Sequence, residues 1–197
     1  EESYDARVTP GAQLPSSEEA REDGSFGRES FLRALVVELA HQVEAHNGPA
    51  HNEQLVARVG SNVGARMEEE YRRARELLAP LTPAQMADLY VRLKHAIDGD
   101  FYVIEITAER IVLGNRRCPF GEAVKAAPGL CRMTSSVFGG IAARNTGGSA
   151  VQLEERIAVG DPECRVIVWF GQAAHRARES EYAHFYAGGE EAPKTGR

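Results

Sequence analysis

Residues 101–113 read FYVIEITAERIVL, and this stretch decides the fold class. Within it Tyr102, Ile104 and Ile106 alternate with other residues, a short turn follows, and apolar residues resume at Ile111. A period of two on both sides of a short turn predicts a β-hairpin. Because the hairpin follows a long stretch with a helical period, the sequence predicts an α+β fold and not a doubly wound sheet.

Three helices are predicted before the hairpin, over residues 30–47, 52–78 and 83–99. Thr82 as the N-cap before Pro83 is a good start signal for the third helix. Apolar residues recur at helical spacing in all three, and we expect them to face inward. They are Phe31, Leu35, Leu39 and Val43, then Leu55, Val59, Val63, Met67 and Tyr71, and then Met86, Leu89, Tyr90, Leu93 and Ile97.

Gly60 and Gly64 lie four residues apart on the second predicted helix. Glycine lowers helix stability by up to about 1 kcal/mol relative to alanine, so a reason in packing is expected. We expect another element of the chain to pack closely against these glycines, with a second subunit as the alternative.

The second half of the chain is predicted to hold one helix, two strands and a short last helix. The first helix spans 128–145 and ends at Gly147-Gly148, and the strands span 151–159 and 164–170. The last helix is expected within 176–186. The predicted fold is therefore a single α+β domain with N-terminal helices packed on a small antiparallel β-sheet.

Composition predicts where this domain begins and ends along the chain. Residues 1–28 are rich in Glu, Ser, Gly and Pro and carry few large apolar residues, which predicts a disordered N-terminal tail. The domain is expected to span 29–187, and 188–197 are expected to form a C-terminal tail.

The overall composition limits the classes of function that the sequence supports. The 197-residue chain has 43% apolar residues and a net charge of −6, so a core is expected and a basic surface for nucleic acid is not. No apolar run approaches the roughly 18 residues that cross a bilayer, and no basic-then-apolar leader opens the chain, so we expect a cytoplasmic protein without a membrane partner. Enzyme activity lacks support, because no Ser-His-Asp order, phosphate loop or His-Glu-x-x-His helix is found.

Three cysteines, Cys118, Cys131 and Cys164, are the candidate cofactor-binding and metal-binding residues. An odd number does not make a disulfide scaffold, and grouped cysteines in a reducing compartment more often bind metal or do redox chemistry. All three are predicted at the ends of elements, where free backbone N–H groups donate to sulfur. We expect an iron–sulfur cluster, with zinc as the alternative, although the C-x(2–4)-C pair that is usual in zinc fingers is absent.

The three cysteines are not expected to be equivalent. Cys131 falls in the first turn of its predicted helix, beside Arg132, so its thiolate is expected to be the most stabilised. Cys164 begins an apolar strand, and a plain packing role is the alternative for it. Asp161 and Glu163 are the nearest candidates for an oxygen ligand, with turn formation as their other role.

Four short motifs around the cysteines resemble a known family. They are Cys118-Pro119-Phe120-Gly121, Pro128-Gly129-Leu130-Cys131, Phe138-Gly139 and Gly160-Asp161-Pro162-Glu163-Cys164-Arg165. Together they resemble the methanogen output domain family and the related 4-vinyl reductase-type sensory domains, over roughly residues 31–170. The resemblance implies a single sensory domain with cysteine-based cluster or redox chemistry, often attached to a regulatory protein, and a tendency to form homodimers.

The spacing of Cys118 and Cys131 is also similar to that in the effector domain of iron–sulfur-dependent repressors of cluster-assembly operons. Those repressors carry a further cysteine, and Asn145 stands near its place, which leaves the fourth ligand open. They also begin with a winged helix-turn-helix, which this acidic chain lacks. We therefore expect no direct contact with nucleic acid, and besides a second subunit the expected partner is a separate signalling or transcription protein.

Three functions follow from these observations. The first is an iron–sulfur sensory domain, with 4Fe–4S as the expected cluster, that responds to redox state, oxygen or nitric oxide. The second is an apolar small-molecule-binding module of the 4-vinyl reductase type. The third is a thiol switch, either metal-free or zinc-bound. The pocket of the second function is expected to be lined by Met133, Val137, Phe138, Trp169 and Phe170.

Overall fold

The computed structural model describes residues 27–177, 183–188 and 190–191. Its helices are α2 (Arg28–Asn47), α3 (Pro49–Ala74), α4 (Pro83–His95), α5 (Cys131–Thr146) and α6 (Gly171–Ala177). Its strands are β1 (Phe101–Ile106), β2 (Arg110–Asn115), β3 (Ser149–Glu155), β4 (Cys164–Phe170), β5 (Ala183–Ala187) and β6 (Glu190–Glu191). Short 3-10 helices are η1 (Gly121–Ala126), η2 (Pro128–Leu130) and η3 (Ile157–Val159).

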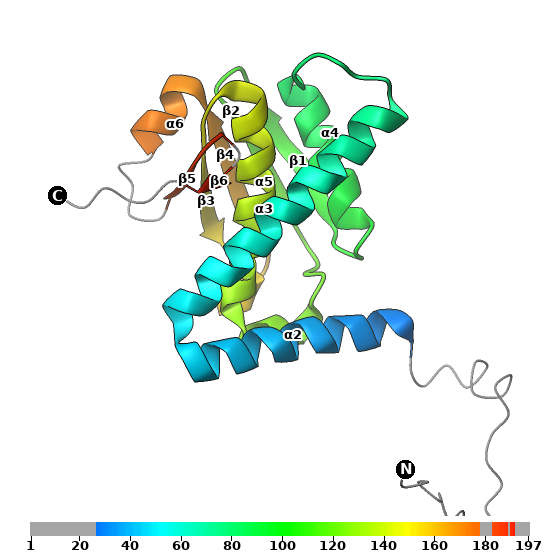
Figure 1. The fold of residues 1–197 in the computed structure, drawn as a ribbon, viewed down its shortest axis with the longest axis vertical. Helices are drawn as coiled ribbons and strands as arrows, with labels where there is room; N and C mark the ends of the chain where they lie inside the picture. Colours follow the sequence, from blue (N-terminus) through cyan, green and yellow to red (C-terminus); the bar gives the residue numbers. More distant parts are fainter. Residues whose placement is uncertain (1–26, 178–182, 189, 192–197) are drawn as a thin grey trace, which may run out of the picture.

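The strands form one six-stranded sheet in the order β1-β2-β4-β3-β5-β6, and every neighbouring pair is antiparallel. Helix α5 crosses one face of the sheet, and α3 packs along α5 on the side away from the strands (Figure 1). Helix α2 runs across the end of this layer, and α4 lies beside β1 and β2. The chain is thus a single α+β domain, as the sequence predicted.

Local sequence signals account for the ends of two helices. Thr82 caps α4 in a reciprocal capping box, in which its side chain accepts a hydrogen bond from the Gln85 backbone and the Gln85 side chain accepts one from the Thr82 backbone. Helix α5 ends at Gly147, whose φ of 78° lies in the left-handed region that favours glycine. Both ends were predicted.

The main core lies between α5 and the sheet. Alternate residues of β4, Val166, Val168 and Phe170, face α5 and are buried there with Phe138. On the opposite face of the sheet, Trp169 packs with residues of α6. Within the described ranges, no helix combines the length and the apolarity that a membrane-spanning segment needs.

Helix α2 buries a different face from the one that its apolar stripe predicted. Phe31, Leu35 and Leu39 were expected to face inward, but Phe31 is 66% exposed and Leu39 is 56% exposed. The buried residue of this helix is Ala40. A small residue at the contact lets α2 lie close to the 3-10 helices beneath it, which leaves the large apolar side chains outside.

Helix α3 shows the same reversal except at Tyr71, which is buried as expected. Leu55, Val59 and Val63 are exposed, although their spacing predicted an inward stripe. The buried residues are Asn52, Val56, Ala57, Gly60, Gly64, Glu68 and Tyr71.

The two glycines explain which face of α3 was selected. A Cβ atom at Gly60 would lie 2.9 Å from Cβ of Ser136, and one at Gly64 would lie 3.2 Å from Cα of Val137. Helices α3 and α5 therefore approach more closely than larger side chains allow. The expected close packing within the chain is confirmed, so this glycine surface is not available to a second subunit.

Three other predictions need correction. Ile97 was expected to face inward, but α4 ends at His95 and Ile97 is 44% exposed. The strand predicted over 151–159 ends at Glu155, and η3 follows it. The helix predicted over 176–186 is also wrong, because α6 begins at once after β4 and β5 then adds a strand to the sheet.

The predicted tails fall mostly outside the described residues. Residues 1–26 lie outside them, and Arg28 already belongs to α2. In the segment 188–197, Glu190–Glu191 form β6, which pairs with β5.

Candidate functional site

Two strands and a helix bring the three cysteines to one end of the sheet. Strand β2 ends at Asn115, which pairs in register with Cys164 at the start of β4. Cys118 follows three residues after Asn115, in the turn before η1. Cys131 is the first residue of α5, which begins at this same end. Residues far apart in the sequence therefore meet because β2, β4 and α5 share this end of the fold.

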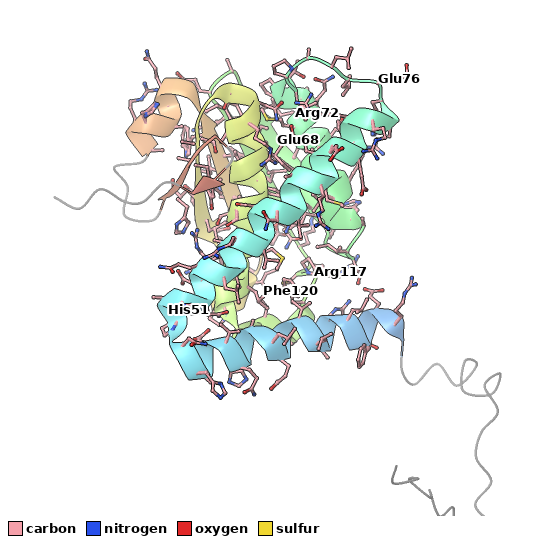
Figure 2. The ribbon with its side chains drawn as sticks, viewed as in Figure 1. His51, Glu68, Arg72, Glu76, Arg117 and Phe120 are labelled. Carbon is pink, nitrogen blue, oxygen red and sulfur yellow. The ribbon has the colours of Figure 1, made fainter. Side chains whose placement is uncertain are left out.

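The three cysteines line one cavity of about 40 Å³. Its walls are mostly apolar and come from β1, β2, β3, β4, α5 and the turn before η1. They are formed by Phe101, Asn115, Cys118, Pro119, Phe120, Val124, Cys131, Thr134, Leu153, Glu155, Arg156, Cys164 and Val166. On the side toward α2, Phe120 (Figure 2) joins a second, smaller core with Cys118 and Cys131. The structure thus brings together all three cysteines that the sequence singled out, and all three are free thiols.

Hydrogen-bond donors point at the sulfur atoms. The Ile157 backbone N–H donates to Cys164 Sγ at 3.5 Å, and Asn115 Nδ2 donates to the same sulfur at 3.7 Å. The backbone of Phe120 hydrogen-bonds to Cys118. Such donors stabilise negative charge on sulfur and tune centres that cysteine thiolates hold.

As free thiols, two of these cysteines are poorly acidic. Burial raises the pKa of Cys118, and the hydrogen bond with the Phe120 backbone opposes this shift. Burial raises the pKa of Cys131 to about 11, and the nearby Cys164 and Cys118 add to the shift. Grouping three thiols in an apolar site therefore disfavours thiolates unless a cation or metal compensates them.

The expected stabilisation of the Cys131 thiolate is not found. Arg132 was expected to favour it, but this side chain is buried and turns elsewhere. Its Nη1 donates to Ser135 Oγ at 2.9 Å, and its Nε lies 3.9 Å from Glu53 Oε2. Although Arg132 is next to Cys131 in sequence, its guanidinium group does not lie beside the sulfur, because the side chain points along α5 toward α3.

Arg156 lines the cavity, and its positive charge opposes the rise in the pKa of Cys131. The second cation beside the cysteines is Lys94, which the sequence analysis missed. It lies in the last turn of α4, is 4% exposed, and interacts electrostatically with all three cysteines. Its Nζ donates to Oγ1 of Thr134, a residue of the cavity wall, at 2.7 Å. One signal was present in the sequence, because Lys94 stands four residues after Tyr90 and eight after Met86, on the buried stripe of α4.

The other candidate ligands form hydrogen bonds with residues outside the cysteine group. Asp161 Oδ2 accepts a hydrogen bond from the Arg156 backbone at 2.7 Å, and Glu163 accepts one from the Tyr102 hydroxyl at 2.7 Å. Asn145 lies near the other end of α5 from Cys131, roughly 20 Å along the helix axis, and bonds to Glu68 there. Glu155 lines the cavity and is the acidic residue of its wall.

A second cavity, more polar and of about 280 Å³, adjoins the first. Cys118 lines both cavities. The other residues around the second cavity are Arg116, Arg117, Gly121, Glu122, Lys125, Ile157, Gly160, Asp161 and Pro162. Cys118 is therefore the cysteine that lies between the apolar cavity and a larger polar one.

The residues expected to line an apolar ligand pocket belong to the core instead. Val137, Phe138 and Phe170 are buried in the main core between α5 and the sheet. Neither of the two cavities described above is lined by them or by Met133 or Trp169. Pockets for small organic ligands usually have volumes of about 300–1,000 Å³, far above the cavity at the cysteines.

The residue types at this site are those that hold thiolate-bound centres. Three cysteines line one cavity, N–H groups point at sulfur, and a buried cation stands beside them. Among the residues that the structure describes, no group of three or more His, Cys, Asp or Glu side chains is arranged to hold a metal ion.

Comparison with known proteins supports the resemblance noted in the motifs. A search of curated proteins found no match. A family model described as methanogen output domain 1 matches residues 31–169, which include all three cysteines and the elements that carry them. The chain belongs to the methanogen output domain 1 family.

Proposed function

We propose that this protein is a sensory or regulatory domain that binds an iron–sulfur cluster, of 4Fe–4S type, through Cys118, Cys131 and Cys164. The observation that supports the proposal most is that three cysteines from separate elements line one apolar cavity. Such a cluster exchanges single electrons and reacts with oxygen and nitric oxide. The reduced thiols that it needs suit the cytoplasm, where we expect the protein to act with a separate signalling or transcription protein.

The spacing of the cysteines favours a cluster over a single zinc ion, because the C-x(2–4)-C pair that is usual in zinc fingers is absent. Zinc takes four ligands around one atom, with each sulfur about 2.3 Å from it. A cluster distributes its cysteines over several irons, so they surround a cavity without meeting at one point.

The chain's own residues would hold and protect the cluster in distinct ways. The N–H groups that point at Cys164 would stabilise its thiolate. The apolar wall, including Leu153 and Val166, would exclude water. Three cysteine ligands leave one iron without a cysteine, which suits a site that responds to small oxidants.

Oxygen sensitivity is the first test of a sensory role. Anaerobically purified protein should lose most of its visible absorbance and release iron when air or a nitric oxide donor is added, because one iron lacks a cysteine ligand. A parallel sample kept under argon is the control. Protein whose iron and absorbance stay unchanged under both oxidants would show that the centre is structural.

We also propose that the protein forms a homodimer through α2 and α3. Phe31, Leu35 and Leu39 recur every four residues on α2 and are exposed, and Leu55 and Val59 do the same on α3. Neighbouring exposed apolar side chains are typical of interaction sites. No charged residue belongs to either stripe, so a second copy with the same stripes would cover them without burying a charge.

Leu35→Asp should convert the dimer to a monomer, because it places a charge in the centre of the α2 stripe. Light scattering at micromolar concentration should give twice the chain mass of 21.5 kDa for the wild type and a single chain mass for the variant. His41→Asp, on the other exposed flank of α2, is the matched control and should remain dimeric. A wild-type protein that stays monomeric at all concentrations would contradict the dimer.

A further inference from the structure

Lys94 is a buried cation whose hydrogen-bond and ring partners are neutral. Its Nζ donates to Thr134 Oγ1 and lies 5.3 Å and 5.4 Å from the ring centres of Phe101 and Phe138. Across the described ranges, no Asp or Glu forms an ion pair with it. The surrounding hydroxyl group and aromatic faces are neutral, so they offset only part of the cost of burying an ammonium group.

A buried ammonium group of this kind needs a negative partner. Taking such a charge out of water is costly, and buried charges in proteins are paired or lie beside a bound ion. Burial lowers the pKa of Lys94 to about 8, and the anionic forms of Cys118, Cys131 and Cys164 are the groups that oppose this shift. Lys94 Nζ donates to Thr134, which lines the cavity of the three cysteines, so the partner of Lys94 is to be sought in that cavity.

We infer that Lys94 is a buried counter-charge of the centre held by Cys118, Cys131 and Cys164, and that this centre is net anionic. The inference rests on the proposed function and adds a role for a residue that would not bind iron. Three thiolates outweigh the positive charge of an iron–sulfur core, and each added electron makes the centre more negative. A nearby cation stabilises the more negative state, so Lys94 should raise the reduction potential and strengthen retention of the centre.

The position of Lys94 suits this role. It reaches the cavity wall through Thr134, one turn into α5 from Cys131, and it enters from α4, which carries none of the three cysteines. It is nearly fully buried, so water does not screen its charge. Its effect should be on the charge of the centre and not on the position of any cysteine.

Lys94→Gln tests the charge alone, because glutamine has a similar length and can still donate to Thr134. Lys94→Met is a second neutral variant, in case the first does not fold. Lys125→Met is the matched control, since Lys125 is half-exposed on η1 and pairs with Glu122. The first readout is the midpoint potential of the reconstituted protein, measured by following one-electron reduction with dithionite by electron paramagnetic resonance.

Both neutral Lys94 variants should lower the equilibrium constant for reduction at least about tenfold, which corresponds to a fall of about 59 mV for one electron. Lys125→Met should leave the potential unchanged. The second readout is the melting temperature of the metal-free proteins at neutral pH. There the Lys94 variants should melt higher than the wild type, because an uncompensated buried charge is gone.

The two readouts separate this inference from the proposed function. If the wild type binds no iron, the proposed function fails and the inference falls with it, and the metal-free melting temperatures then decide only whether the charge of Lys94 destabilises the fold. An unchanged potential in the Lys94 variants would overturn the inference even though the cluster is present. Metal-free Lys94 variants that melt below the wild type would also overturn it, because Lys94 would then stabilise the fold through its contacts with Thr134 and the aromatic rings.

Discussion

Cys131→Ser should lower the iron bound by anaerobically purified protein at least about tenfold and remove its visible absorbance. Even changes to residues that only support a ligand commonly cost about 10- to 100-fold in metal affinity, and Cys131 would be a ligand itself. The loss should be severe because the described residues offer few substitutes: Asp161 and Glu163 already accept hydrogen bonds elsewhere. Cys118→Ser and Cys164→Ser should behave in the same way.

Met133→Leu is the matched control for this loss. It changes a neighbouring sulfur-containing side chain in the first turns of α5, outside the wall of the cysteine cavity, and conserves volume. This variant should keep its iron. Far-ultraviolet circular dichroism should show that the serine variants remain folded. Folded Cys131→Ser protein with wild-type iron content would contradict the assignment of Cys131.

Glu68→Ala should lower the free energy of unfolding by about 3–5 kcal/mol, the usual cost of removing one partner from a buried charge network. Glu68 is 4% exposed on α3 and accepts hydrogen bonds from Arg72, Arg144 and Asn145. Figure 2 shows Glu68 and Arg72 one turn apart on α3, in the upper half of the helix. Removing the carboxylate would take one acceptor from each of these residues and would leave Arg72 and Arg144 without their acidic partner where α3 packs on α5.

Urea unfolding measures this cost, and Glu69→Ala is its control. Glu69 is the next residue of α3, but its side chain is 71% exposed and pairs with an equally exposed Arg73. Exposed pairs contribute about 1 kcal/mol or less, so this variant should stay close to the wild type. A loss below about 1 kcal/mol for Glu68→Ala would mean that its partners find water or new acceptors.

The parts of the fold that local sequence controls were predictable. The hairpin of β1 and β2 follows from a period of two around a short turn, and the start of α4 follows from Thr82 and Pro83. The strand β5 was missed, since its pairing partner β3 lies far away in the sequence. A helix was predicted there because long-range pairing leaves little local signal.

The buried faces of α2 and α3 were not predictable from hydrophobic spacing. Spacing shows where apolar residues gather, but it does not show whether the same chain covers them. On α3 the face that packs on α5 is chosen by Gly60 and Gly64, which permit close approach, and it includes the polar Glu68. The stripe with Leu55 and Val59 is left exposed.

The candidate site was predictable in its residues but not in its electrostatics. The three cysteines were selected because they lie at the ends of predicted helices and strands, and the fold places them around one cavity. Arg132, the neighbour of Cys131 in sequence, was expected to supply the positive charge beside the cysteines. In the structure Lys94, from α4, lies there instead. Spatial neighbours of a site depend on how α4 packs on the sheet, which no local motif encodes.

The central proposal is tested most directly by the iron and acid-labile sulfide content of protein purified and reconstituted without oxygen. About four irons and about four sulfides per chain are expected, with visible absorbance that dithionite partly bleaches. Inclusion of zinc in the growth medium should not change this ratio. A colourless protein with one zinc per chain, or a protein without metal after reconstitution, would contradict an iron–sulfur centre at Cys118, Cys131 and Cys164.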